Sequence, residues 1–431
     1  MIERANRFLL GHTMELVAEI FARPATPADL TISRFFAARR YLGSHDRGFI
    51  ADTTYALLRD VIRLRMALGE LLSSAHADDQ PYILAAAFLV DRGLDRALVA
   101  DATEIPERDV ERLGAALASA DAGLDALEPD ERAAMRHSIP VWLAERLREQ
   151  YGDEEADALM AALKTQAPIV LRANRLVTDR ERLVAALEEL GIEATPGALS
   201  PDAVVLTRRI NAFTVPQFKQ GWFELQDEGS QLISLALDPH PNWRVFDACA
   251  GAGGKTLHLA AIMKGRGEVI AHDINDRRLA ELRPRLKRSG AQNVRIMDNA
   301  TYLERRESML GELNAVVIDA PCSGTGVLRR NPGVRLTIDE TTVERLLPQQ
   351  AEILDEYSTL VRPGGLMLYA TCSLLREEND AQVEAFLERA SGWERVPITL
   401  PADVVDADGY YRAFPHRHGT DGFFGALLRR G

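Results

Sequence analysis

Three cysteines are the residues of this 431-residue chain with the clearest chemical potential: Cys249, Cys322 and Cys372. Each lies just beyond a short apolar run that predicts a buried strand. A lone cysteine is most often a small core residue, but structural cysteines should also occur in the first half of the chain, which has none. Two thiols facing one crevice indicate covalent catalysis by a thiolate. A disulfide switch is the alternative, and a reducing compartment disfavours it.

Aspartates end three consecutive predicted strands: Asp273, Asp298 and Asp319. Each one taken alone has a simpler explanation as a helix cap. Buried carboxylates need partners, and an acid about twenty residues beyond a glycine turn can accept hydrogen bonds from ribose hydroxyls. Three acids in successive units therefore favour a ligand site.

A glycine-rich turn, Asp247 to Thr256, follows the first of these strands. It does not match a Walker A motif, because Cys249 stands where that motif has glycine. It does not match the dinucleotide-binding fingerprint either, because Thr256 stands where that fingerprint has its last glycine. Such a turn suits a nucleoside or amino-acid ligand without a pyrophosphate. Lys255 and Asp319 are the ionisable groups expected beside the thiols.

The elements that must position these residues begin at about Trp243, where short apolar runs alternate with helical patterns. The alternation predicts an α/β fold with a parallel, doubly wound sheet, whose chemistry lies at the carboxyl ends of its strands. The expected strands are Arg244 to Ala248, Glu268 to His272, Val294 to Met297, Ala315 to Ile318, Leu366 to Ala370 and one within Gly422 to Leu428. The expected helices are Thr256 to Met263, Asp276 to Arg288, Thr342 to Leu360 and Asn379 to Arg389.

The pattern before this region predicts two further parts. Residues 1–165 are helical throughout, and residues 166–240 predict a small α/β subdomain, which leaves 241–431 for the doubly wound domain. The helical part carries an arginine cluster, for which a solvated helix face and a phosphate-binding surface are equally supported. Its members are Arg34, Arg39, Arg40, Arg47, Arg59, Arg63 and Arg65.

Composition sets limits on the partners. The chain has 51 Lys and Arg against 64 Asp and Glu, a formal net charge of −13, which argues mildly against nucleic acid without excluding a local basic surface. The three cysteines show no metal-ligand spacing, so we expect no metal and no disulfide framework. No apolar run is long enough to span a bilayer. We therefore expect a cytoplasmic protein with no membrane partner.

With these residues assembled, the chain resembles the Sun-type RNA cytosine-5 methyltransferases from about residue 168 to its end. The motifs that carry the resemblance are Asp247 to Thr256, Asp319-Ala-Pro-Cys-Ser-Gly-Thr-Gly326, Tyr369-Ala-Thr-Cys-Ser373 with Glu377-Glu-Asn379, and Thr420-Asp-Gly-Phe-Phe424; Leu171 to Arg175 and Leu347 to Leu354 add to them. The N-terminal part is similar to the NusB-like RNA-binding domain of the bacterial ribosomal RNA branch, through Gly43 to Ile50 and Tyr55 to Arg59.

The resemblance implies a Rossmann-like methyltransferase sheet, S-adenosylmethionine as cofactor and a cytosine in RNA as substrate. It makes Cys372 the nucleophile, with Cys322 assisting its release. Asp319 would lie where methionine and the base meet, and we expect Lys255 to orient or polarise the base. The implied cofactor-binding residues are Cys249, Ala250, Gly251, Ala252, Gly253, Gly254 and Lys255, with Asp273 at the ribose, Asp298 at the adenine, and Asp319.

Three positions depart from the family pattern: Ala252 replaces a proline of the cofactor loop, and Gly333 and Leu336 replace an acid and an aromatic. The bacterial branch implies ribosomal RNA of the 16S type, with transfer RNA or another RNA as the alternative. An inactive RNA-binding assembly factor is a further alternative. A DNA cytosine-5 methyltransferase would have Pro-Cys-Gln here, whereas Ser323 follows Cys322. An adenine amino-methyltransferase would have Asp/Asn-Pro-Pro and an aromatic residue at the strand end, where this chain has Asp319-Ala-Pro-Cys322. We expect a monomer that does not bind DNA.

Overall fold

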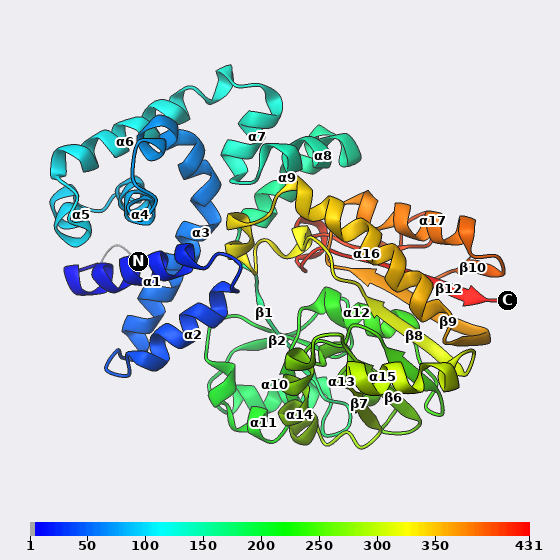
Figure 1. Cartoon of the computed structure of the whole chain (residues 1–431). Helices are drawn as coiled ribbons and strands as arrows, with labels where there is room; N and C mark the ends of the chain where they lie inside the picture. The colour runs from blue at the N-terminus through cyan, green and yellow to red at the C-terminus, as the bar shows by residue number, and fades with distance from the viewer. Residues whose placement is uncertain (1–4) are drawn as a thin grey trace. The chain divides into compact units, whose positions relative to one another are not determined.

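Two compact units make up the chain in the computed structural model, which describes residues 5–431. The first unit contains the chain up to Gln166 together with 327–340, and the second contains 167–326 and 341–431 (Figure 1). The chain thus leaves the second unit directly after the Cys322 loop and returns to it at Thr341. This excursion is not apparent from the sequence, and the domain boundaries expected at residues 165 and 240 stay a prediction.

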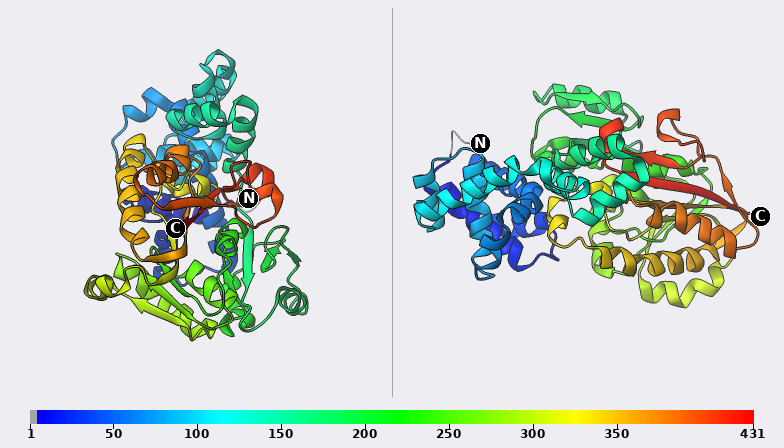
Figure 2. Two further views of the ribbon diagram at one scale, coloured as in Figure 1. Left: turned by 90° about the vertical axis from the view of Figure 1, so that its right-hand side faces the viewer. Right: turned by 90° about the horizontal axis from the view of Figure 1, so that it is seen from above.

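The first unit is helical, as its pattern predicts (Figure 2). Its long helix α3 packs against α1, α4, α6 and α7. The helices within the described part of this unit are α1 (Arg7–Ala22), α2 (Ala28–Ala38), α3 (Ser44–Ser73), α4 (Gln80–Asp91), α5 (Arg96–Thr103), α6 (Glu107–Ala122), α7 (Pro129–His137), α8 (Val141–Tyr151) and α9 (Asp153–Lys164).

Residues 327–340 form part of the helical unit's core. The buried Arg335 guanidinium donates to the backbone carbonyls of Ser138, Leu163 and Leu328, and burial lowers its pKa to about 9. Leu336 packs against both hydrophobic clusters of this unit, and a Cβ at Gly333 would lie 3.0 Å from that of Ala28. The two departures from the family pattern in this segment are therefore packing positions.

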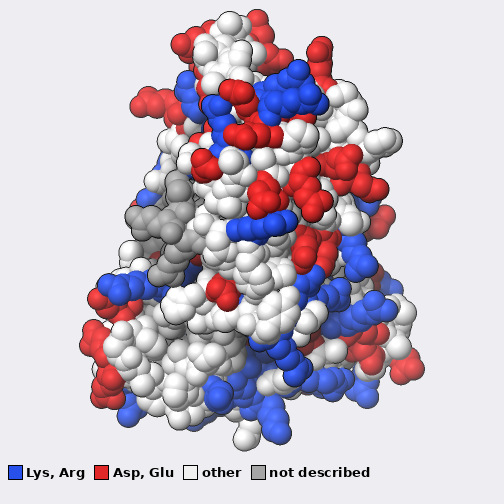
Figure 3. Space-filling model, turned by 90° about the vertical axis from the view of Figure 1, so that its left-hand side faces the viewer, with Lys and Arg blue, Asp and Glu red and all other residues white. Residues whose placement is uncertain are grey.

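The arginine cluster is divided by its contacts. Arg63 pairs with three aspartates and Arg39 with two glutamates. Arg34 and Arg40 are exposed and form no ion pair within residues 5–431. Figure 3 shows positive and negative side chains interspersed over this side of the molecule. Only part of the cluster is thus available to bind phosphate.

The second unit begins with a four-stranded antiparallel sheet of order β2-β3-β1-β4. Its strands are β1 (Ile169–Ala173), β2 (Ala194–Pro196), β3 (Ala203–Leu206) and β4 (Phe223–Leu225), and the helices of this region include α10 (Arg180–Glu188) and α11 (Pro216–Lys219). The sheet encloses its own apolar cluster, which includes Leu171, Leu183 and Phe223.

The larger sheet has the order β10-β12-β9-β8-β5-β6-β7, with β11 paired to β12. Its strands β5 to β9 run parallel and β12 runs antiparallel to β9. The order reverses between β5 and β8, so the loops after these strands flank a topological switch point, where ligands bind in such sheets. The strands are β5 (Arg244–Asp247), β6 (Glu268–His272), β7 (Val294–Met297), β8 (Leu313–Asp319), β9 (Val361–Thr371), β10 (Trp393–Val396), β11 (Tyr411–Ala413) and β12 (Phe423–Arg430).

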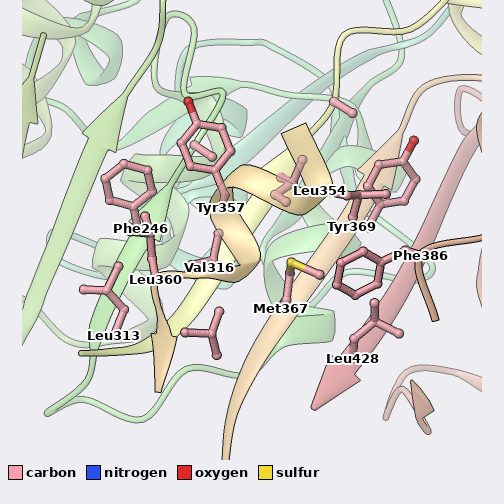
Figure 4. Close-up of a cluster of buried hydrophobic side chains, with 14 of the residues drawn as sticks. Phe246, Leu313, Val316, Leu354, Tyr357, Leu360, Met367, Tyr369, Phe386 and Leu428 are labelled. Carbon is pink, nitrogen blue, oxygen red and sulfur yellow. The ribbon is translucent and has the colours of Figure 1, made fainter. Parts of the chain in front are cut away.

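Helices cover both faces of this sheet, which confirms the doubly wound prediction. Alternate residues point to opposite faces of a strand, and Phe246, Val316 and Met367 meet Leu354 and Tyr357 of α16 on one face (Figure 4). Helices α12 and α13 contact the sheet as well. The helices are α12 (Glu228–Leu237), α13 (Gly254–Ile262), α14 (Asp276–Ser289), α15 (Asn299–Arg305), α16 (Glu340–Ser358), α17 (Asp380–Arg389) and α18 (Pro415–His418).

Candidate active site

A cavity of about 1310 Å³ lies at the carboxyl ends of β5, β6, β8 and β9. All three cysteines line it and none forms a disulfide. The structure therefore brings together most of the residues that the sequence singled out: Cys249, Ala250, Gly251, Ala252, Gly254, Lys255, Asp273, Asp319, Cys322 and Cys372. Gly253 and Asp298 are the two predicted residues that do not line it.

The glycine turn after β5 holds its shape through two left-handed residues. Gly251 has φ +53° and Gly253 has φ +83°, and a Cβ at Gly253 would lie 2.1 Å from Leu282 Cδ1. Gly253 therefore serves close packing of the turn against α14 rather than the cavity wall. At Ala252, the position that departs from the family pattern, the carbonyl accepts a hydrogen bond from Arg285 at 2.8 Å.

The three predicted acids are placed differently. Asp273 accepts hydrogen bonds from the backbone N–H groups of Gly251 and Asn275, at 2.9 and 2.8 Å, and lines the cavity. Asp298 is exposed and caps α15 by accepting from Thr301 N at 2.8 Å, which is the simpler role considered for it. Asp319 ends β8 and faces the cavity.

Asp319 forms an ion pair with Lys255. The distance from Lys255 Nζ to Asp319 Oδ2 is 2.5 Å. Burial lowers the pKa of Lys255, but the charge and hydrogen bond of Asp319 outweigh it, and the pKa is raised overall. The charge of Cys372 acts in the same direction. An ammonium group thus lines the same cavity as the Cys372 thiol.

The two central sulfurs lie close together. Cys322 Sγ is 3.4 Å from Cys372 Sγ, within reach of a thiol hydrogen bond. Parallel pairing of β8 with β9 sets Asp319 opposite Ala370, which brings both cysteine loops to one edge of the sheet. The hydrogen bond to Cys372, together with burial, raises the pKa of the Cys322 thiol. Cys322 therefore retains its proton more firmly than an ordinary cysteine.

Asp247 is a cavity residue whose role the sequence analysis missed. It is fully buried; its Oδ2 accepts from the Thr256 hydroxyl at 2.6 Å, and no partner for its Oδ1 occurs in residues 5–431. Burial raises its pKa to about 7. An unpartnered acid beside Asp273 and Asp319 makes this cavity suited to a ligand that carries positive charge.

Several other polar residues were missed as well. Gln226, Arg278 and Arg285 line the cavity, while the buried Glu378 and Gln350 lie behind the cysteine loops and bond to each other at 3.0 Å. Glu378 and Gln350 stand inside the stretches that resemble the family, but sequence alone gave no reason to join segments that are 28 residues apart.

Two family profiles match the chain. One, described as 16S rRNA methyltransferase RsmB/F, covers residues 234–429, and one for the ferredoxin-like domain of these methyltransferases covers 139–212. Among curated proteins, a probable ribosomal RNA small subunit methyltransferase B of Bacillus subtilis is 30% identical over 419 residues, which are 90% of this chain and 92% of that protein. The ribosomal RNA small subunit methyltransferase B of Pseudomonas syringae is 32% identical over 380 residues, 87% of this chain and 79% of that one.

Solved structures agree with this match. The crystal structure of PH0851 has a TM-score of 0.82 at 25% identity and covers 97% of this chain and 99% of its own. A methyltransferase homologue from Pyrococcus horikoshii has a TM-score of 0.62 at 27% identity, over 71% of this chain and 100% of its own. NSun6 of the same organism, solved with SFG, shares the fold, with a TM-score of 0.60 at 21% identity, over 66% of this chain and 97% of its own.

Proposed function

The chain belongs to the RsmB/F family of 16S rRNA methyltransferases, and on that premise we propose that it methylates carbon-5 of a cytosine in small-subunit ribosomal RNA. Its cofactor is S-adenosylmethionine. One observation carries the choice of cytosine carbon-5: two free thiols 3.4 Å apart, beside an ammonium group, in the cofactor cavity. Methylation of an amino group or a hydroxyl needs no such pair.

The residues of the cavity fit the cofactor. S-adenosylmethionine supplies an electrophilic methyl group on a positively charged sulfonium. The unpartnered Oδ1 of Asp247 and the carboxylate of Asp319 are suited to its cationic end. The turn from Cys249 to Lys255 would bind the methionine and ribose parts, with Asp273 as acceptor for the ribose hydroxyls. For Asp298, the adenine contact stays a prediction, because its carboxylate already caps α15.

Cys372 is the proposed nucleophile. Carbon-5 of cytosine is a weak nucleophile, and attack of a thiolate on carbon-6 makes carbon-5 enamine-like. The raised pKa of Cys322 disfavours that thiol as the attacking group, and the Lys255 ammonium in the same cavity would stabilise negative charge that develops during attack by Cys372. Asp319 accepts a hydrogen bond from the exocyclic amine of the base and holds it for attack.

Cys322 is proposed to assist release. After methylation a base must remove the proton on carbon-5 while the bond between carbon-6 and Cys372 breaks. The distance of 3.4 Å from Cys322 Sγ to Cys372 Sγ supports a role for Cys322 in this step, because its side chain would lie next to the bond that breaks. Without it the covalent RNA–protein adduct should persist.

Methyl transfer from labelled cofactor to unmodified ribosomal RNA tests the proposal. We expect Cys372→Ala to lose activity and to form no adduct, and Cys322→Ala to accumulate an adduct visible on a denaturing gel. Cys249→Ala, which removes the third thiol, should accumulate none. Full activity of Cys372→Ala would overturn the nucleophile assignment, and normal turnover of Cys322→Ala without adduct would overturn the release role. Mapping 5-methylcytosine in ribosomal RNA with and without the protein identifies the target.

The helical unit is proposed to contact RNA. The exposed Arg34 and Arg40 support this role, since they form no ion pair in the described chain and can bind phosphate. A flipped-out or single-stranded cytosine is expected, because the carbon-6 face must be reachable.

A further inference from the structure

A buried carboxylate lies behind both cysteine loops. Glu378 has no exposed surface and belongs to the short 3₁₀ helix Arg376–Glu378 that follows β9. Its Oε1 accepts hydrogen bonds from Ser323 N at 2.8 Å and from Gln350 Nε2 at 3.0 Å. Its Oε2 accepts from the hydroxyl of Ser323 at 2.5 Å and from that of Ser373. Four donors thus satisfy one buried acid.

The two serines are the direct neighbours of the two thiols. Ser323 follows Cys322 and Ser373 follows Cys372, so one carboxylate joins both loops. The pairing of β8 with β9 ends at Asp319 and Ala370. Both cysteines lie beyond that ladder, and the distance between their sulfurs is therefore set by contacts of the loops.

Two further contacts complete this connection. Gln350 Nε2 donates to the carbonyl of Pro321 at 2.9 Å as well as to Glu378. Gly326 N donates to the carbonyl of Cys372 at 2.9 Å. The two serine hydroxyls also lie 3.3 Å apart, and Thr325 Oγ1 lies 3.5 Å from that of Ser323 and 3.3 Å from that of Ser373. Glu378 is the acidic group of this network and bonds to the residues after both cysteines.

We propose that Glu378 is a positioning residue that holds Cys322 and Cys372 in reacting geometry and keeps the proton of the pair on Cys322. The inference rests on the proposed two-thiol chemistry and deepens it. A misplacement of about 1 Å in a reacting group costs roughly 100-fold in rate, so a single buried acid that sets this distance has a large effect.

The groups around Cys322 support the proposal that the proton of the pair stays on Cys322. Its pKa is raised by the hydrogen bond to Cys372, by burial, and by the charges of Cys372 and Glu378. The other titratable groups near the pair are Tyr369 and, on the cavity side, Lys255 with Asp319. The Tyr369 hydroxyl donates to the Glu378 carbonyl at 2.7 Å, and burial raises the pKa of Tyr369. Tyr369 is thus neutral, and the carboxyl group of Glu378 is the acid on this side of the pair.

The first test measures Cys322 alone. The chain has three cysteines, so Cys249→Ala with Cys372→Ala leaves Cys322 as the single thiol, and its rate of alkylation by iodoacetamide against pH reports its ionisation. Adding Glu378→Gln should move the midpoint to lower pH by about one pH unit, because a neighbouring negative charge is lost. Glu388→Gln removes the same charge from an exposed site on α17 and should not move it. An unmoved midpoint in Glu378→Gln would overturn the charge role.

The second test measures the effect of Glu378 on turnover in the chain that retains all three cysteines. Glu378→Asp keeps the charge but is one methylene too short to reach both serines. We expect kcat to fall about 100-fold with the KM for S-adenosylmethionine changed by less than about threefold. Ser373→Ala, which removes one link and leaves the acid, should lower kcat in the same way by a smaller factor. Unchanged kcat in either variant would overturn the positioning role.

The two proposals fail separately. The alkylation experiment needs neither RNA nor turnover, so it reads the effect of Glu378 even if Cys372→Ala retains methyl transfer and the proposed function falls. If Cys372→Ala is inactive while Glu378→Gln leaves the midpoint of Cys322 unmoved, only the present inference is lost.

Discussion

Gly253→Ala should destabilise the second unit and weaken cofactor binding, although Gly253 does not line the cavity. The residue sits at φ +83°, where an alanine costs about 1–2 kcal/mol. Its new Cβ would lie 2.1 Å from Leu282 Cδ1, and overpacking of this kind costs about 1–3 kcal/mol. The expected total is therefore about 2–5 kcal/mol.

A matched control separates the two contributions. Gly290 has φ +74° with nothing within 4 Å of an added Cβ, so Gly290→Ala should cost only the backbone share, about 1–2 kcal/mol. Urea unfolding followed by fluorescence gives both values, and calorimetric titration gives the affinity for S-adenosylmethionine. Because Leu282 is the residue in the way, Gly253→Ala combined with Leu282→Ala should be more stable than the two separate losses predict.

Two results would refute this reasoning. Equal destabilisation by Gly253→Ala and Gly290→Ala would mean that the turn can move away from α14. If the stability losses of Gly253→Ala and Leu282→Ala were strictly additive, the clash with the Leu282 side chain would not be the cause of the destabilisation by Gly253→Ala.

Three further predictions concern charge. Arg335→Ala leaves three buried carbonyls without their donor and should lower the free energy of unfolding by about 3–5 kcal/mol, as measured by urea titration; a loss below about 1 kcal/mol would contradict it. Burial raises the pKa of Asp247 to about 7, so the folded state binds this proton more tightly than the unfolded chain, and the free energy of unfolding falls as pH rises from about 4 to 7. Asp247→Asn should remove this pH dependence. Parallel pH profiles of stability in the two proteins would argue against the role of Asp247. Arg34→Ala with Arg40→Ala should reduce the salt dependence of RNA affinity by a slope of about 2, whereas Arg108→Ala on α6 should not; an unchanged slope would exclude those arginines from phosphate contact.

The sequence was most informative where local patterns determine position. Five parallel strands fall where apolar runs predicted them, because the centres of β5, β6, β8 and β9 are apolar and buried, while β7 at the edge of the sheet is apolar at three of its four positions. The same regularity placed Cys249, Cys322 and Cys372 at strand ends, and a parallel sheet collects strand ends at one edge. The cavity therefore followed from the order of elements, without knowledge of any side-chain contact.

The sequence was least informative where distant segments meet. The segment 327–340 looks like an ordinary loop, and only its packing shows that it belongs to the helical unit. The arginine cluster could not be assessed from the sequence because two of the three aspartate partners of Arg63 lie 28 and 58 residues away. Asp273 and Asp298 have the same position after their strands, but one accepts from the cofactor turn and the other only caps a helix.

The choice between the two thiols shows how these limits combine. Motif spacing treats Cys322 and Cys372 alike, since each follows a strand end and precedes a serine. Their surroundings differ. The charge of Cys372 contributes to the raised pKa of Lys255, while the charge of Glu378 contributes to the raised pKa of Cys322. The negative group therefore favours the proton at Cys322. This difference in surroundings involves one residue of the cofactor turn and one beyond β9, and it supports the two different roles proposed for the thiols, which no spacing of motifs could supply.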